Sequence, residues 1–200
     1  MLNRFRDRAN DLIRPLAEAI ARTGVSPNAL TFIGFVVGLF AAFFFARGEQ
    51  ILAGLALLVA GFFDIIDGAV ARVVKRETAF GGVLDSVVDR YVDFAIFAGI
   101  IYAFLSSPPR IPEISFMVGW GWAWCMLAIS GSFMVSYIRA RAEAAGSGKL
   151  DVGIAERAER LLILAVGALV GYTQYSVVII VILTHLTVLQ RLFVAGRRLS

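Results

Sequence analysis

Six long runs of apolar residues constrain this chain more than any other feature. A soluble domain has about 45–50% apolar and about 25% charged residues, whereas this chain has 59% and 17%. A helix that crosses a bilayer needs roughly 20 mostly apolar residues, and the runs lack the alternation of β-barrel strands. Residues 1–200 are therefore predicted to form one all-α integral membrane domain. The six expected transmembrane helices are 28–46, 50–72, 81–105, 113–140, 158–172 and 175–195.

The N-terminal residues 1–23 predict an amphipathic helix that lies in the membrane interface, ahead of a six-helix bundle over residues 28–195. Arginines and acids cover one face of this helix, as in helices that lie in the headgroup layer. A soluble surface helix is the alternative. The apolar face consists of Leu2, Phe5, Ala9, Leu12, Ile13, Leu16 and Ile20.

The basic residues predict the orientation of the chain. With the N-terminus inside, 16 of the 19 Lys and Arg residues lie on the cytoplasmic side, and the outer loops hold only Arg47 and Arg110. This is the positive-inside pattern, so the net charge of +4 is attributed to orientation and not to nucleic-acid binding. We expect both termini on the cytoplasmic side of a prokaryotic plasma membrane, because an even number of spans returns the chain to its starting side.

Four aspartates within the apolar runs form the candidate site. Asp64 and Asp67 lie near the cytoplasmic end of the second run, and Asp85 and Asp89 lie near the start of the third. These spacings of three and four residues place each pair on one helical face. The short connection 73–80 predicts that the two helices are antiparallel neighbours, with the two pairs facing each other at one depth.

The four carboxylates predict a metal site. They would repel one another at low dielectric, and even one unpaired carboxylate near the bilayer centre is costly. Divalent cations are the natural partners, and oxygen ligands favour hard ions such as Mg²⁺ or Mn²⁺ over zinc. The alternatives are structural ion pairs with Arg72 and Arg90, or a transport path.

Small residues and one arginine accompany the aspartates. Gly68 follows Asp67, Ala71 lies one turn further on, and Gly81 opens the third run. Small side chains let a nucleotide or a partner helix approach the backbone, and helix packing alone would explain any single glycine. Arg72 offers a guanidinium fork that suits phosphate oxygens.

These residues and spacings resemble the signature of the CDP-alcohol phosphatidyltransferase family. Every fixed position of the signature is matched, and the resemblance extends through the six runs and the N-terminal helix. It implies an enzyme that transfers a phosphate-linked group from a CDP-activated lipid to a small alcohol at the cytoplasmic face of the membrane. The matching stretch is Asp64-Ile-Ile-Asp67-Gly68-Ala-Val-Ala71-Arg72, then eight residues, then Gly81, Asp85 and Asp89.

The resemblance also implies the roles of individual residues and a homodimer. Two Mg²⁺ or Mn²⁺ ions would be held by Asp64, Asp67, Asp85 and Asp89. Asp89 would in addition be the general base toward the acceptor hydroxyl. The CDP pocket would be lined by Gly68, Ala71, Arg72, Gly81 and Asp85. Asn28 and Thr31 could also reach the nucleotide, with helix capping as the alternative.

Arginines outside the signature indicate the acceptor. Residues 136–143 close the fourth run and residues 156–160 open the fifth, on the same rim as the aspartates. Arginine clusters favour a phosphorylated anion, and positive-inside flanking is the alternative. These segments, and Asp89-Arg90-x-x-Asp93, resemble the branch of the family that makes phosphatidylinositol phosphate or its archaeal ether analogue. That implies inositol 1-phosphate as the acceptor, its phosphate held by Arg139, Arg141, Arg157 and Arg160.

Other functions stay open at this point. The acceptor could be glycerol 3-phosphate or another small alcohol, or the donor could be CDP-inositol. A small cation transporter is the alternative outside enzymes. It predicts acids spread across the bilayer depth, whereas these aspartates cluster near one face. The sequence does not distinguish a diacylglycerol donor from an archaeol donor.

Overall fold

The computed structural model describes residues 13–75 and 78–199, and every regular element in these ranges is helical. The all-α fold class is therefore confirmed. A helix over residues 13–22 comes first. It is followed by α2 (Pro27–Arg47), α3 (Gln50–Val73), α4 (Ala79–Leu105), a short 3-10 turn η1 (Ser115–Met117), α5 (Gly121–Ala144), α6 (Arg157–Leu169) and α7 (Thr173–Leu199).

Local sequence determines where several helices begin and end. Helix α2 begins after Ser26, whose hydroxyl accepts a hydrogen bond from Ala29 N at 3.2 Å. It ends at Gly48, whose φ of 76° lies in the left-handed region that glycine adopts without strain. Thr78 caps α4 in the same way as Ser26, with Gly81 N donating to its Oγ1 at 2.9 Å. These caps hold the starts of two helices that carry site residues.

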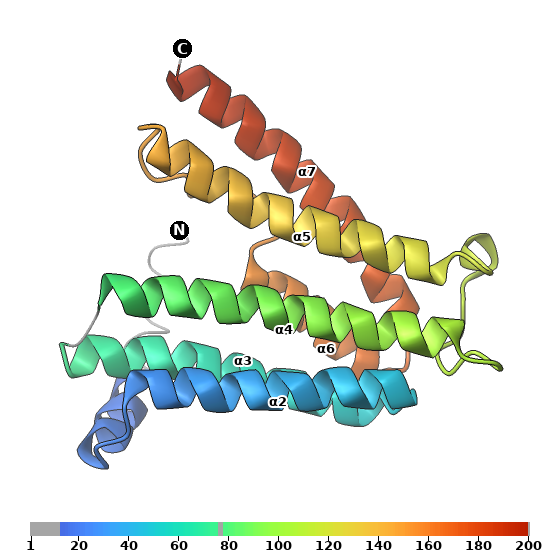
Figure 1. The fold of residues 1–200 in the computed structure, drawn as a ribbon, viewed down its shortest axis with the longest axis horizontal. Helices are drawn as coiled ribbons and strands as arrows, with labels where there is room; N and C mark the ends of the chain where they lie inside the picture. The colour runs from blue at the N-terminus through green and yellow to red at the C-terminus, as the bar shows by residue number, and fades with distance from the viewer. Residues whose placement is uncertain (1–12, 76–77, 200) are drawn as a thin grey trace.

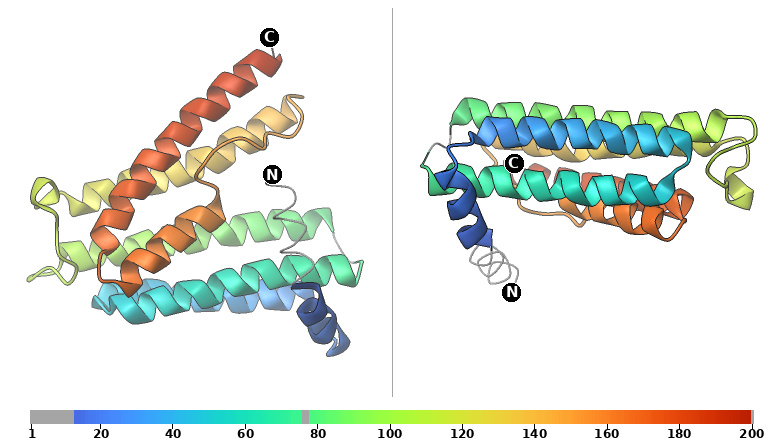
Figure 2. Two further views of the ribbon diagram at one scale, coloured as in Figure 1. Left: turned by 180° about the vertical axis from the view of Figure 1, so that it is seen from behind. Right: turned by 90° about the horizontal axis from the view of Figure 1, so that it is seen from below.

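The six long helices close a ring. Helix α2 packs on α3 and α4, α4 on α5, α5 on α7, α7 on α6, and α6 on α3. Figure 1 shows α2, α3 and α4 with nearly parallel axes, while α5 and α7 diverge from α4 toward the end where α4 begins. The reverse view in Figure 2 shows the same divergence. The bundle is thus tight at one end and wider at the other.

The interior of the ring is packed with apolar side chains, and many large apolar side chains also face outward. Phe45, Leu57 and Ile100 are fully buried, whereas Phe40 and Phe43 on α2 are more than half exposed. Small residues allow the closest helix contacts: a Cβ on Gly99 of α4 would collide with the backbone carbonyl of Ala42 on α2. An apolar exterior over a packed interior is what a lipid-embedded bundle requires.

Within residues 13–75 and 78–199, four helices are long and apolar enough to cross a membrane, namely α2, α3, α5 and α7. The chain is therefore a multi-pass membrane protein. Helix α6 has only 13 residues, which at 1.5 Å per residue is about 20 Å, less than the roughly 30 Å hydrocarbon core. Helix α4 is 27 residues long but has charged residues through its first half. That α4 and α6 also cross the membrane, which would complete the six predicted spans, stays a prediction.

Several of the expected boundaries differ from the structure, and α5 and α7 both end four residues later than predicted, at Ala144 and Leu199. The run at 113–140 begins later, at Gly121, because residues 113–120 form a loop that contains η1. The Glu113 carboxylate accepts hydrogen bonds from Gly119 N at 2.7 Å and Gly121 N at 3.0 Å, which caps the start of α5. The run at 158–172 ends earlier, since α6 stops at Leu169.

The helix over residues 13–22 packs against the bundle. Ala17 is fully buried and lies in one apolar cluster with Leu30, Ile66 and Val70, next to the partly buried Ile13. Figure 2 shows this helix at a steep angle to α2 and α3. Ile13 and Ile20 of the predicted apolar face thus pack against the cluster of α2 and α3, whereas Leu16 of that face is 43% exposed. Residues 1–12 of the predicted interfacial helix lie outside the described residues.

Candidate active site

The four predicted aspartates line one small space of about 20 Å³, the aspartate cavity. Asp64 and Asp67 come from α3, and Asp85 and Asp89 come from α4. The two helices are antiparallel, as expected (Figure 1), but they are not close neighbours, because each packs on α2. The aspartates therefore reach toward one another across the space that α2 keeps open between α3 and α4.

Three of the aspartates have a geometry that suits a cation. One carboxylate oxygen from each of Asp64, Asp85 and Asp89 lies within 4.8 Å of the other two. A set of carboxylate oxygens suits a hard divalent cation. The donor chemistry therefore fits the predicted metal.

Asp67 has a different environment from the other three. It is 6% exposed, and its Oδ2 accepts a hydrogen bond from Thr31 Oγ1 at 2.5 Å. Thr31 lies on α2, so this contact ties the carboxylate to a third helix. Asp67 thus has one oxygen oriented by Thr31, as expected for a ligand with outer support.

Arg157 lies among the same carboxylates. Its Nη1 is 2.7 Å from Asp64 Oδ1 and 2.7 Å from Asp89 Oδ1. The guanidinium comes from the first residue of α6 and links α6 to both α3 and α4. A divalent cation that used these two oxygens would take the place of this contact.

A second space, of about 210 Å³, lies on the α2–α3–α4 side and is called the signature pocket. It brings together all of the residues that the resemblance or their position assigned to CDP. Those residues are Asn28, Thr31, Gly68, Ala71, Arg72, Gly81 and Asp85. Thr31, Asp67 and Asp85 line both this pocket and the aspartate cavity. A Cβ on Gly81 would lie 2.9 Å from the capping Oγ1 of Thr78, so a larger residue here would displace that hydroxyl.

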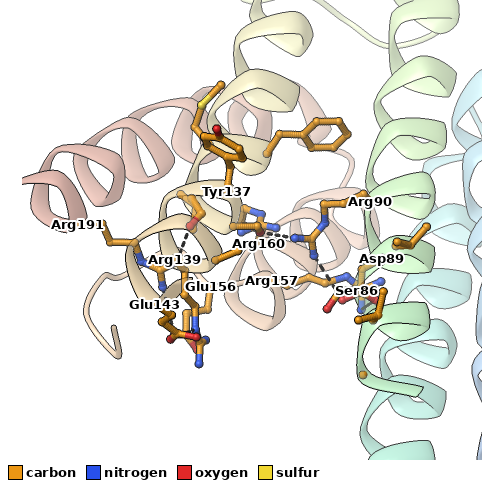
Figure 3. Close-up of a pocket in the computed structure, with 18 of the residues that line it drawn as sticks. Ser86, Asp89, Arg90, Tyr137, Arg139, Glu143, Glu156, Arg157, Arg160 and Arg191 are labelled. Carbon is orange, nitrogen blue, oxygen red and sulfur yellow. Dashed lines mark hydrogen bonds and ion pairs between the residues drawn. The ribbon is translucent and has the colours of Figure 1, made fainter. Parts of the chain in front are cut away.

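A third and larger space, of about 1020 Å³, lies where α5 diverges from α4, and is called the arginine cavity. Figure 3 shows Asp89 and Arg90 of α4 on one side, Arg139 and Glu143 of α5 on the other, and Arg157 between them. Asp89 and Arg157 also line the aspartate cavity. The charged residues of the arginine cavity are Arg90, Arg139, Arg157, Arg160 and Arg191, with Asp89, Glu143 and Glu156.

Three of the four arginines predicted to hold the acceptor line this cavity, and Arg141 does not. Arg139 and Arg141 are both on α5, but a step of two residues turns a helix by about 200°. Arg141 is exposed. Arg141 thus shares a segment with Arg139 but not a face, and its contact with the acceptor stays a prediction.

The arginines in the cavity already have acidic partners. Arg139 is 3.2 Å from Glu143 Oε1 and 3.2 Å from Asp151 Oδ1. Arg160 Nη2 is 3.0 Å from Asp93 Oδ2. Five arginines and three carboxylates line the cavity itself, while Asp93 and Asp151, outside this lining, pair with two of the arginines.

Two arginines of this cavity were missed from the sequence. Arg90 Nη1 donates a hydrogen bond to Ser136 Oγ, which joins α4 to α5. Arg191 is almost fully buried, and it donates to Val135 O at 2.6 Å and to Val152 O at 2.7 Å. A charge inside an apolar run was a usable signal. For Arg191 it was obscured because positive-inside flanking explained the residue equally well.

The helical bundle, its apolar exterior and the aspartate cluster between two polar spaces together define an integral membrane protein whose carboxylates suit a divalent cation. The model of the family described as CDP-alcohol phosphatidyltransferase matches residues 24–190. The chain therefore belongs to this family and is a transferase of phospholipid biosynthesis.

Relatives of named activity cover almost all of the chain. The archaetidylinositol phosphate synthase of Pyrococcus horikoshii is 39% identical over 200 residues, which is 100% of this chain and 99% of that protein. The crystal structure of the Mycobacterium tuberculosis phosphatidylinositol phosphate synthase with CDP-DAG bound matches with a TM-score of 0.78 and 28% identity, over 92% of this chain and 94% of that one. The same enzyme in complex with manganese and citrate matches with a TM-score of 0.76 and 28% identity, over 91% and 88%.

Proposed function

We propose that this protein transfers the lipid phosphate group of a CDP-activated lipid to inositol 1-phosphate and releases CMP. The observation that carries the proposal is that the aspartate cavity lies between two other spaces and shares lining residues with each of them. The aspartate cavity shares Thr31, Asp67 and Asp85 with the signature pocket, and it shares Asp89 and Arg157 with the arginine cavity. A nucleotide donor and an anionic acceptor would therefore approach the aspartates from opposite sides.

The proposal includes two divalent cations, Mg²⁺ or Mn²⁺. They would be held by Asp64, Asp67, Asp85 and Asp89. When bound, such ions polarise the two phosphates of the donor and stabilise the negative charge that develops on the leaving CMP. The oxygen cluster of three of these aspartates supports this assignment, as does the manganese in the solved relative.

The signature pocket would bind the CDP part of the donor. Gly68, Ala71 and Gly81 leave the backbone accessible to a nucleotide. Arg72 would direct its guanidinium fork to phosphate oxygens. Asn28 at the start of α2 would contact the nucleotide, and Thr31 would orient Asp67 toward the metal site. The solved relative with CDP-DAG bound supports a CDP-lipid as donor.

Asp89 would act as the general base. It is the aspartate that lines both the aspartate cavity and the arginine cavity. In the step proposed here, the acceptor hydroxyl oxygen forms a bond to the lipid-linked phosphorus, and the bond from that phosphorus to the bridging oxygen breaks. The hydroxyl proton passes to Asp89, and the electron pair leaves with CMP. No covalent enzyme intermediate is required.

The arginine cavity would bind the phosphate of the acceptor through Arg139, Arg157 and Arg160. Arg90 Nε supports this use, because it is a buried donor without a hydrogen-bond partner among the described residues. Arg157 Nε also makes no hydrogen bond there and lies 3.5 Å from Asp93 Oδ1. Leaving such groups unpaired is costly, and phosphate oxygens would satisfy them. The relatives named for inositol phosphate lipids support the same acceptor.

We also propose the topology. Both termini and the site would face the cytoplasm of a prokaryotic cell, and the protein would be a homodimer in the plasma membrane. The distribution of Lys and Arg supports this orientation. Accessibility labelling of single cysteines placed at the ends of the described chain tests it, in a Cys125→Ser background. Labelling from outside intact cells would contradict the proposed topology.

An acceptor screen tests the proposed function. Purified protein is supplied with CDP-archaeol or CDP-diacylglycerol, with Mg²⁺ or Mn²⁺, and with inositol 1-phosphate, glycerol 3-phosphate, serine or inositol. We expect release of CMP that requires both the metal and inositol 1-phosphate. Release driven only by glycerol 3-phosphate or another alcohol would mean that this compound, and not inositol 1-phosphate, is the acceptor. Metal flux into proteoliposomes without CMP would favour a transporter.

A further inference from the structure

Asp93 is a buried carboxylate that the proposed reaction does not use. It lies on α4, one helical turn after Asp89, and is 5% exposed. Its two oxygens contact two different arginines of α6. Asp93 Oδ2 is 3.0 Å from Arg160 Nη2, and Asp93 Oδ1 is 3.5 Å from Arg157 Nε.

The partners of Asp93 are two of the arginines that line the arginine cavity. Arg160 is 4% exposed, and its Nη1 also donates to Ala155 O at 2.8 Å. This arginine is therefore held by one carboxylate and one backbone carbonyl. Helices α4 and α6 do not pack closely on one another, so the Asp93 contacts are a side-chain link between them.

Arg157 is held at both ends of its guanidinium. Nη1 contacts Asp64 and Asp89 at 2.7 Å each, whereas Nε faces Asp93 at 3.5 Å. If Asp64 and Asp89 hold a cation, their oxygens are no longer available to Arg157 in this way. Asp93 is then the carboxylate of this group that stays with Arg157, beside the arginine cavity.

We infer that Asp93 is a positioning residue for the acceptor. It holds Arg157 and Arg160 side by side at the wall of the arginine cavity, so that both can meet the phosphate of the acceptor. This inference rests on the proposed function, because it takes the arginine cavity as the acceptor site. If Asp93 only neutralised the buried arginines, its removal would instead lower the stability of the fold and change the KM values of both substrates alike.

The Asp93→Asn variant separates these two roles. The amide keeps the shape of the side chain but removes the charge that holds the guanidinium groups. We expect the KM for inositol 1-phosphate to rise about tenfold, since a displaced arginine loses its hydrogen bond to the charged phosphate of the acceptor. The KM for the CDP-lipid should stay within about twofold. A calorimetric titration with inositol 1-phosphate in Mn²⁺ buffer, without donor, should show the same loss of affinity.

Glu113→Gln is the matched control. It makes the same carboxylate-to-amide change in the loop before α5, at the other end of α4 (Figure 1). We expect both KM values to stay unchanged in this variant. Equal changes in both KM values for Asp93→Asn, or no change in either, would overturn the inference.

A double-variant cycle adds a readout that a purely structural role would not move. If Asp93 acts through Arg160, then Asp93→Asn combined with Arg160→Gln should bind the acceptor about as weakly as the weaker single variant. If the affinity of the double variant for the acceptor falls by the product of the two single-variant losses, the inference is contradicted. If Asp93→Asn does not fold, Asp93→Glu takes its place, because the longer side chain keeps the charge but displaces both arginines. It should raise only the acceptor KM, and an unchanged acceptor KM would count against the role.

The wild-type protein in the same assay tests the proposed function separately. If it turns over no inositol 1-phosphate, the proposed acceptor is wrong. The ratio between variant and wild type is then measured with the phosphorylated acceptor that does release CMP. A selective change in that acceptor's KM still supports the role of Asp93, and a change in both KM values refutes it.

Discussion

The two spaces that flank the aspartates are built in different ways. The signature pocket is lined by residues of two helices that follow each other in sequence, and by the start of α2. The arginine cavity is lined by residues of α4, α5, α6 and α7, and of the loop before α6. The first is thus largely a product of local spacing, and the second depends on the closure of the whole ring.

The charges differ as much as the construction. Arg72 accompanies Asp67 and Asp85 in the signature pocket, whereas five arginines outnumber three carboxylates in the arginine cavity. The acidic side suits a donor whose phosphates arrive with cations, and the basic side suits an acceptor that carries its own phosphate. One aspartate cluster would thus serve two anions, of which the donor is neutralised by cations and the acceptor by arginines.

The largest effect is expected where the two sides meet. Asp89→Asn removes the proposed base and should lower kcat by roughly 10²–10⁴-fold. Release of CMP at saturating substrates measures it. The KM for the CDP-lipid should change far less, because the signature pocket is intact. A kcat within about threefold of wild type would contradict the role of Asp89.

A smaller but selective effect is expected on the basic side. Arg139→Gln should raise the KM for inositol 1-phosphate by about tenfold or more, since a charge-assisted contact to phosphate is lost. Arg141→Gln is the matched control, because it removes an arginine two residues further along α5 that does not line the cavity. Initial rates against each substrate distinguish the two. Equal effects of both variants would mean that the general basic charge of this segment is what matters.

On the acidic side, Thr31→Val removes the hydroxyl that donates to Asp67 Oδ2. Loss of an outer contact to a metal ligand typically costs 10–100-fold in affinity or activity, so we expect about tenfold more Mn²⁺ for half-maximal activity. Thr31→Ser keeps the hydroxyl and should behave like wild type. If the two variants need the same Mn²⁺ concentration, the hydrogen bond does not support the metal site.

The smallest effect is expected from Ser26, a helix cap whose own side chain lines neither space. Ser26→Ala removes the acceptor for Ala29 N and should cost about 1 kcal/mol of stability. A thermal melt in detergent measures this as a lowered Tm, with both KM values unchanged. An unchanged Tm would mean that contacts of α2 with α3 and α4 alone hold its first turn.

The sequence predicted the acidic side well, for a physical reason. Spacings of three and four residues determine helical faces whatever the tertiary structure, so Asp64 with Asp67 and Asp85 with Asp89 could be placed before any fold was known. The relation between their helices was harder to predict. A short connection indicated direct neighbours, but α2 packs on both helices and keeps them apart.

The basic side was predicted only in part. Arg139, Arg157 and Arg160 were found because they cluster near helix ends, but the contact of Arg157 with Asp64 joins residues far apart in sequence. Nothing local indicates it. Arg141 was included because a basic segment does not reveal which residue faces inward. Arg191 was missed since one charge near the end of an apolar run is equally typical of positive-inside flanking.

The most direct measurement of the central claim is a structure of the protein with Mn²⁺, a CDP-lipid and inositol 1-phosphate bound to a slow variant such as Asp89→Asn. We expect the cytidine in the signature pocket, against Gly68 and Arg72, and the acceptor phosphate in the arginine cavity, between Arg139 and Arg157. The two metal ions should lie among Asp64, Asp67 and Asp85, beside the substituted position 89. Nucleotide and acceptor phosphate in the same space would contradict the two-sided arrangement.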